Sequence, residues 1–235
     1  MGDKEVRIVG ISTSPRKGAN TETMIDRALE SSTRYVEEYG YSAKTEIISL
    51  AGKKILPCFN EDLCVKNKDY CQIDDDWLDL VDHLIDPTPD GLVFGSPVYF
   101  FNQNSLGRAF MERFTSLVKG FWFEDFPHDP PDFTNTAAGA VAVGADRHGG
   151  VEHTMSTIIH WLLTMGFITV GGFYIGGGGW THEDDSPDAV EGEELSLESA
   201  SLVGKKVAKT AMLLKRGNRS FKEEEDRELS VDLWM

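Results

Sequence analysis

Five short apolar segments alternate along this chain with longer segments whose apolar residues recur at helical spacing. Each short segment is apolar along its whole length instead of at every second residue, which is typical of parallel strands buried on both faces. The alternation therefore predicts an open α/β fold, in which helices cover a parallel sheet, and one domain accounts for all of it. The strands are predicted at residues 6–11, 45–50, 91–94, 137–143 and 167–175.

The segments between these strands predict five helices, and the chain continues beyond the last of them. We expect one domain over residues 1–217, followed at 218–235 by an acidic tail or an arm for oligomerisation. The helices are predicted at residues 22–38, 75–85, 104–118, 151–165 and 197–214.

Three segments fall outside the alternation. Residues 53–74 form an insertion that contains every cysteine of the chain. Residues 120–135 are rich in aromatic residues and proline, and we expect them to shape a ligand site. Residues 176–194 join four glycines to a strongly acidic stretch, whose charge would repel a pyrophosphate. We therefore expect a flexible loop or lid at 176–194, and no nucleotide loop.

The charge balance excludes one class of partner. The 235 residues include 39 acidic and 23 basic ones, for a formal net charge of −16. A protein that mainly binds nucleic acid needs a net basic face, so we expect no nucleic acid partner. No apolar stretch approaches the ~20 residues that cross a bilayer, and the first residues lack the layout of a signal peptide. We expect a cytoplasmic protein without membrane association.

The loop after the first strand has the composition of an anion site. In open parallel sheets, ligands bind outside the carboxyl ends of the strands. Here that loop carries Ser12, Ser14, Arg16, Asn20 and Thr21 just before a helix. Hydroxyls, an amide, a guanidinium and the free N–H groups of a helix start suit a phosphate, although the glycine spacing of a Walker A or dinucleotide loop is absent. The residues alone leave two interpretations open, a phosphate cradle and an N-cap with a solvated turn.

Three motifs lie at the ends of the first, third and fourth predicted strands. They are Ser14-Pro15-Arg16-Lys17-x-x-Asn20-Thr21, the run DGLVFGSPVYF at 90–100, and Gly149-Gly150-Val151-Glu152-x-Thr154. In this order they resemble the flavodoxin-like NAD(P)H-dependent FMN reductases. The resemblance implies a flavodoxin-like three-layer sandwich with a five-stranded parallel sheet in the order 2-1-3-4-5. One departure is Val151, where the family often has glutamine.

The resemblance also implies that the chain binds FMN. The first loop would hold the phosphate, the loop at 97–100 would line the isoalloxazine, and two glycines would let backbone approach the ring. The alternative for Tyr99, Phe100 and Phe101 is an aromatic cluster in the core. The implied cofactor-binding residues are Ser12, Ser14, Arg16, Asn20, Thr21, Pro97, Val98, Tyr99, Phe100, Asn102, Ala145, Gly149, Gly150 and Glu152.

The function that the resemblance implies is an FMN-dependent oxidoreductase. The flavin would take a hydride from NAD(P)H and pass electrons to a small-molecule or protein acceptor, so no side chain is assigned a catalytic role. The family resemblance suggests a homodimer or homotetramer. One alternative is an electron carrier between partner proteins, and another is a module that has lost its cofactor and serves only in assembly.

The cysteine segment, residues 53–74, is similar to an insertion in the iron–sulfur flavoproteins. That insertion carries C-x2-C-x2-C-x(4–7)-C, and here Cys58, Cys64 and Cys71 match three positions while Glu61 stands in the second. A hard carboxylate is a poor substitute for a thiolate on iron. Three possibilities stay open: a cluster with an atypical fourth ligand, a zinc ion with a further ligand such as His83, and unligated thiols.

Overall fold

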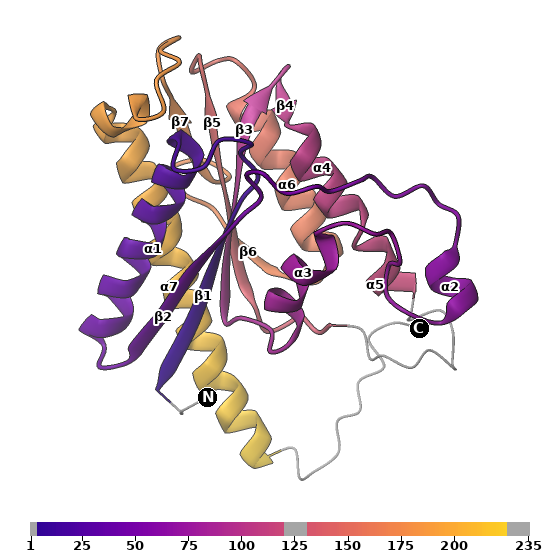
Figure 1. Cartoon of the computed structure of the whole chain (residues 1–235). Coiled ribbons are helices and arrows are strands. Elements are labelled where there is room, and N and C mark those ends of the chain that lie inside the picture. Colours follow the sequence, from indigo (N-terminus) through magenta and orange to yellow (C-terminus); the bar gives the residue numbers. More distant parts are fainter. Residues whose placement is uncertain (1–3, 120–130, 225–235) are drawn as a thin grey trace.

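A computed structural model describes residues 4–119 and 131–224 of the chain (Figure 1). One twisted sheet runs through the molecule, and helices cover both of its faces. Residues 225–235 of the tail or arm expected at 218–235, and residues 120–130 of the aromatic segment, lie outside the described residues. Among the described helices, none is long and apolar enough to span a membrane.

Five parallel strands form the sheet in the order β2-β1-β3-β5-β6. The short strand β4 is antiparallel and lies outside this order. When only the parallel strands are counted along the chain, the order is 2-1-3-4-5, as predicted, and the flavodoxin-like fold class is confirmed. The strands are β1 (Glu5–Ser12), β2 (Ser42–Ser49), β3 (Gly91–Tyr99), β4 (Asn102–Gln103), β5 (Ala137–Gly144), β6 (Ile168–Val170) and β7 (Gly177–Trp180).

The fifth position of the sheet is divided between two strands. β6 pairs with the first half of β5, at 137–139, and β7 pairs with its second half, at 141–144. The flexible loop expected at the four glycines is therefore wrong for Gly177, Gly178 and Gly179, which lie in a fully buried strand. Glycine suits this strand because a Cβ on Gly177 would lie 3.0 Å from the Val141 side chain and one on Gly179 would lie 3.1 Å from Met24, so a larger residue would push these neighbours aside.

Two layers of helices enclose the sheet. On one face lie α1 (Asn20–Glu38) and α7 (Glu194–Glu224), which continues past residue 217. The other face is covered by α3 (Trp77–Ile85), α4 (Ser105–Glu112), α5 (Thr115–Lys119) and α6 (Val151–Thr164). The helix predicted at 104–118 is thus interrupted between α4 and α5. A short helix, α2 (Leu63–Asn67), lies in the cysteine segment, and a 3-10 turn, η2 (Ala189–Gly192), precedes α7.

Apolar side chains form one core on each face of the sheet. Met24, Ile25 and Val203 belong to the core under α1 and α7, while Trp77, Phe110 and Ile158 belong to the other. Both cores are anchored on strands that are buried along nearly their whole length. Because parallel strands align their carboxyl ends, the loops after β1, β3 and β5 emerge together at one edge of the sheet.

Candidate functional site

The loop after β1 leads into a helix whose start has no side-chain cap. The N-cap residue of α1 is Ala19, so the N-cap interpretation left open by the sequence is not what the structure shows. The Glu22 and Thr23 amides donate to the Ala19 carbonyl. The Asn20 and Thr21 amides come before them, and the helix itself has no acceptor for these two amides. An uncapped helix start attracts an anion.

Buried hydroxyls surround this helix start. Ser12 and Thr21 are almost fully buried, and the Ser12 Oγ has no hydrogen-bond partner within the described chain. The Ser14 Oγ accepts from the Arg16 amide at 3.1 Å, which curls the loop. Glu22 orders the loop from the helix side, since its Oε2 accepts from the Gly18 amide at 2.7 Å. An unpaired buried hydroxyl beside unpaired amides fits a bound phosphorylated group.

Arg16 and Asn20 contact the acidic segment that follows β7. The exposed Arg16 guanidinium donates to the Asp185 carbonyl at 2.9 Å, and the Asn20 Nδ2 donates to the Ser186 carbonyl at 2.9 Å. The Asn20 Oδ1 accepts from the Val190 amide at 2.9 Å. The side-chain amide of Asn20 is thus engaged on both sides, while Arg16 makes one exposed bond that a phosphate can replace.

Asn104 joins the loop after β1 to the loop after β3. Its Nδ2 donates to the Thr13 carbonyl at 2.6 Å, and its Oδ1 accepts from the Thr13 hydroxyl at 2.9 Å. The same Oδ1 caps α4 by accepting from the Gly107 amide at 3.2 Å. Both residues are buried. The sequence interpretation missed Asn104 as a site residue, although an asparagine just before an amphipathic segment is a recognised N-cap signal.

The residues predicted to line a flat ring form a β-hairpin at the end of β3. Val98 pairs with Gln103 and Tyr99 with Asn102, which leaves Phe100 and Phe101 as a two-residue turn. Both turn residues have left-handed backbone, with φ of +48° and +64°, a conformation that strongly favours glycine or asparagine.

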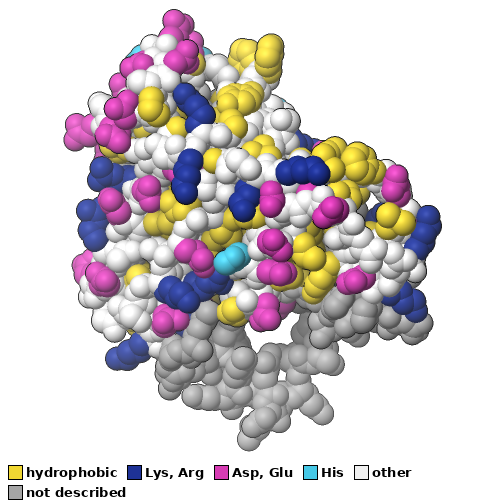
Figure 2. Space-filling view, in the orientation of Figure 1, with side chains coloured by type: hydrophobic (Ala, Val, Ile, Leu, Met, Phe, Trp, Pro, Cys, Tyr) yellow, Lys and Arg dark blue, Asp and Glu magenta, His cyan; other side chains and the backbone are white. Residues whose placement is uncertain are grey.

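The aromatic residues of the turn do not pack into the core. Phe100 is fully exposed and Phe101 is 65% exposed, so the alternative of a core aromatic cluster is wrong. Hydrophobic side chains project from the surface where Figure 1 labels β4 (Figure 2). The turn is held from below, because the Asn102 Oδ1 accepts from the Thr157 hydroxyl at 3.2 Å. Gly150 lies against it, and a Cβ there would be 2.4 Å from the Phe101 Cα.

The loop after β5 completes this edge of the sheet. Ala145 is exposed and its carbonyl accepts from the Glu183 amide at 2.9 Å, while Gly149 and Glu152 follow at the start of α6. The sequence interpretation also missed Arg147, whose guanidinium lies 4.1 Å from the ring centre of the buried Trp180. No spacing rule links a loop arginine to a tryptophan at the end of another strand.

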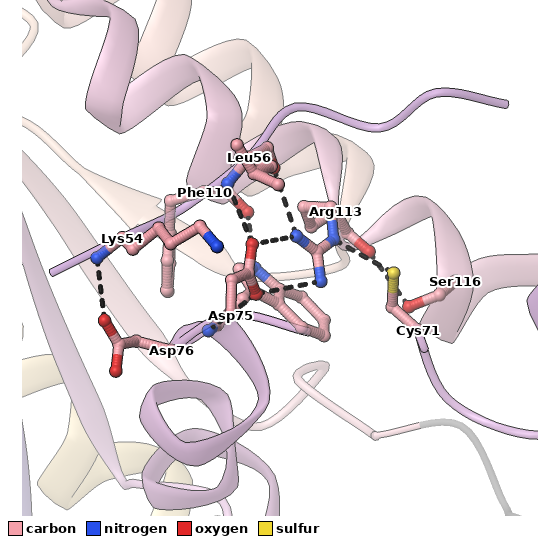
Figure 3. A network of polar contacts seen from close by, with 9 residues as sticks. Lys54, Leu56, Cys71, Asp75, Asp76, Phe110, Arg113 and Ser116 are labelled. Atoms are coloured by element: carbon pink, nitrogen blue, oxygen red, sulfur yellow. Dashed lines mark hydrogen bonds and ion pairs between the residues drawn. The ribbon is translucent and has the colours of Figure 1, made fainter. Parts of the chain in front are cut away.

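Figure 3 shows the buried polar network beneath the cysteine segment. The Arg113 Nη1 lies 2.6 Å from the Asp75 Oδ2, with both side chains inaccessible to solvent. Burial raises the pKa of Asp75, but the bonds from Arg113 and from the Leu56 and Trp77 amides outweigh it, so this pKa lies below its usual range. The Arg113 Nε also donates to the Cys71 Sγ at 3.0 Å.

The three cysteines line one small cavity at the surface of this network. Arg113 and Lys119 also line it, as does Glu61. Burial raises the pKa of the Cys64 thiol, which opposes formation of a thiolate there. The described residues contain no group of three His, Cys, Asp or Glu side chains arranged to hold one metal ion. The zinc alternative with His83 is not formed, because the His83 Nδ1 faces Glu46 at 3.8 Å, near the end of α3.

Comparisons with known proteins agree with this fold and this edge of the sheet. Residues 6–181 match the family model described as NADPH-dependent FMN reductase. An iron–sulfur flavoprotein of Methanocaldococcus jannaschii is 34% identical over 90% of this chain and 100% of its own length. An iron–sulfur flavoprotein of Archaeoglobus fulgidus is 35% identical, over 89% of this chain and 97% of its own.

Solved structures show the same fold at lower identity. A flavone reductase superposes with a TM-score of 0.60 and 20% identity, covering 88% of this chain and 63% of that one. A WrbA-like flavodoxin from Agrobacterium tumefaciens superposes with a TM-score of 0.54 and 15% identity, covering 88% of this chain and 98% of that one. The family match extends over more than half of the sequence and includes all three loops described above. The chain therefore belongs to the NADPH-dependent FMN reductase family.

Proposed function

We propose that this chain, an FMN-binding oxidoreductase of its family, takes a hydride from NAD(P)H and passes the electrons to a separate acceptor. The observation that carries the proposal is the uncapped start of α1, together with the buried Ser12 Oγ at the end of β1, which has no partner among the described residues. A phosphate at this position would satisfy the helix amides and the nearby hydroxyls together. The family match supports flavin as the group that carries the phosphate.

The first loop would bind the phosphate of FMN. Thr21 is buried at the helix start and would donate a hydroxyl hydrogen bond, and Ser14 would do the same after leaving the Arg16 carbonyl, to which its Oγ donates at 3.0 Å. Arg16 would leave the Asp185 carbonyl and form a charge-assisted bond with the phosphate. Asn20 would keep its two bonds to the segment after β7 and so hold the loop in place.

The loops after β3 and β5 would hold the isoalloxazine between them. Pro97 and Val98 are half-buried and Tyr99 is half-exposed, as expected of a loop that lines a ring. Gly149, Gly150 and Glu152 would border the ring from the α6 side. The flavin, when bound, supplies the hydride chemistry, and the protein binds it, orients it and excludes water from it. We include in the proposal the homodimer or homotetramer that the family resemblance implies.

An anaerobic titration tests this function. The full chain, loaded with FMN, is mixed with NADH or NADPH, and the flavin absorbance is followed before and after a soluble acceptor is added. We expect one of the two nicotinamides to bleach the flavin band and the acceptor to restore it. A bound flavin that dithionite reduces but neither nicotinamide does would contradict the reductase and favour an electron carrier.

A further inference from the structure

The cysteine segment of this chain does not offer the four thiolates that hold a cluster of the kind expected in the iron–sulfur flavoproteins. Clusters of the [4Fe–4S] type are held by four cysteine thiolates, and the chain has three cysteines in total. We propose that the cysteine segment folds without a cluster and that Arg113 holds it closed. The one residue that prevents a cluster from binding is Glu61, which stands where a fourth cysteine would be needed.

Arg113 connects the two ends of the cysteine segment. Its Nη1 donates to the Leu56 carbonyl at 3.1 Å, near the beginning of the segment, and its Nε donates to the Cys71 Sγ, near the end. The ion pair with Asp75 lies just beyond that end. In Figure 3 the Leu56 carbonyl, the Asp75 carboxylate and the Cys71 sulfur surround the Arg113 guanidinium. One buried side chain therefore closes the segment as a metal centre would, through protein contacts alone.

The cations beside the thiols already have carboxylate partners. Arg113 is neutralised by Asp75, and Lys119 forms an ion pair with Asp62. Both cations beside the thiols are therefore held by carboxylates of the chain itself, and these ion pairs close the segment without a metal.

The cavity among the cysteines is also small. Its volume is about 40 Å³, and by this kind of measure a cavity needs about 10–15 Å³ to hold one water molecule. A cluster of four irons and four sulfides is far larger than the few water molecules that this space admits. The segment would have to open and lose the contacts of Arg113 to admit it.

Glu61 is placed where a fourth thiolate would be needed. It lines the same cavity as the three cysteines. Its neighbours Asn60 and Asp62 both have left-handed backbone, with φ of +55° and +56°, a conformation that asparagine and aspartate tolerate well. The tight turn therefore carries position 61 to the cavity whatever side chain stands there. Glu61 itself is exposed, so its replacement leaves the core intact.

Together with the proposed function, on which this consequence rests, a segment without a cluster restricts the route by which electrons leave the flavin. Without a cluster the chain has no one-electron centre beside the flavin, so the acceptor must take its electrons from the flavin directly.

Iron and sulfide analysis of one substitution tests the inference. The full chain, Glu61→Cys and the control Glu61→Ala are purified and reconstituted anaerobically with ferrous iron and sulfide. We expect the wild type and Glu61→Ala to keep no stoichiometric iron, and Glu61→Cys to hold about four irons and four sulfides with an iron–sulfur absorbance band. Four irons in the wild type would overturn the inference. A Glu61→Cys chain that holds no more iron than the wild type would overturn the role of Glu61.

A second measurement tests the role of Arg113. We expect a chelator to leave the melting temperature of the wild-type chain unchanged and Arg113→Met to lower it, with or without chelator. A wild-type chain that melts lower after chelation would contradict the metal-free segment. FMN content is measured on the same samples, so failure of the flavin proposal is recognised separately from failure of this one.

Discussion

Asn104 and Thr13 bond to each other twice, although 91 residues separate them. The Asn104 Nδ2 donates to the Thr13 carbonyl at 2.6 Å, and the Thr13 hydroxyl donates to the Asn104 Oδ1 at 2.9 Å. The first of these residues follows the β3–β4 hairpin and the second follows β1. The pair therefore fixes the distance between the proposed phosphate loop and the proposed ring loop before any ligand binds.

Asn104→Ala is expected to lower both stability and FMN affinity. The substitution removes the α4 cap and leaves the Thr13 carbonyl unpaired, which together costs about 1–3 kcal/mol of unfolding free energy. FMN affinity should fall because the two loops lose their fixed spacing. Denaturant unfolding and a fluorescence titration with FMN measure the two effects. Ser105→Ala, at the exposed neighbouring position, is the control, and equal effects of both variants would contradict the role of Asn104.

Arg16→Ala is expected to weaken FMN binding without lowering stability. Arg16 is exposed and its one bond to the Asp185 carbonyl contributes little to the fold. A charge-assisted bond to phosphate is worth about 1.5–3 kcal/mol, so the Kd for FMN should rise about 10-fold or more. Lys17→Ala removes an equal charge one residue away and serves as the control. A Kd that is the same in both variants would remove Arg16 from the phosphate site.

The order of the strands and the edge that carries the site are predictable from the sequence. Apolar runs such as residues 6–11 and 137–143 bury both faces of the sheet, and their order with the helices leaves few topologies. The loops after β1, β3 and β5 follow from that order. Their composition and the family resemblance then predict a phosphate and a ring.

Other features arise only from packing. The strand β7 consists mainly of glycine, which has neither strand propensity nor an apolar side chain, and the structure accounts for it only through the close approach of Val141 and Met24. The left-handed backbone of Phe100 and Phe101 likewise has no signal in two aromatic residues. The bonds of Asn20 to the segment after β7 join positions more than 160 apart, which no local pattern predicts.

Phe101→Gly is expected to stabilise the protein. Phe101 has φ of +64° and a largely exposed ring, so the residue is strained without gaining much burial. Glycine adopts this backbone freely, and relief of the strain should raise the unfolding free energy by about 1 kcal/mol. Thermal unfolding measures the change. Phe59→Gly, at an exposed phenylalanine outside the left-handed residues, is the control and should show no gain.

Asp75→Asn is expected to destabilise the chain in a pH-dependent way. Breaking a buried ion pair leaves Arg113 uncompensated and costs about 3–5 kcal/mol at neutral pH. Because the folded state lowers the pKa of Asp75, the contribution of its carboxylate is fully present above the unfolded pKa of about 3.9. It is lost as the pH falls through the still lower folded pKa.

Denaturant unfolding of the wild type and Asp75→Asn across pH 7 to about pH 3 measures this difference. The gap in unfolding free energy should stay constant down to about pH 4 and shrink below it. A gap that widens on acidification would contradict a lowered pKa of Asp75.

The central claim is that the uncapped start of α1 binds the phosphate of FMN, and the affinities of the wild-type apoprotein for FMN and for riboflavin test it most directly. The two ligands share the isoalloxazine and ribityl chain and differ only in the phosphate. With two or more charge-assisted bonds at stake, fluorescence titration should show FMN binding at least about 100-fold more tightly than riboflavin. Equal affinity for the two ligands, or no binding of FMN, would contradict the account.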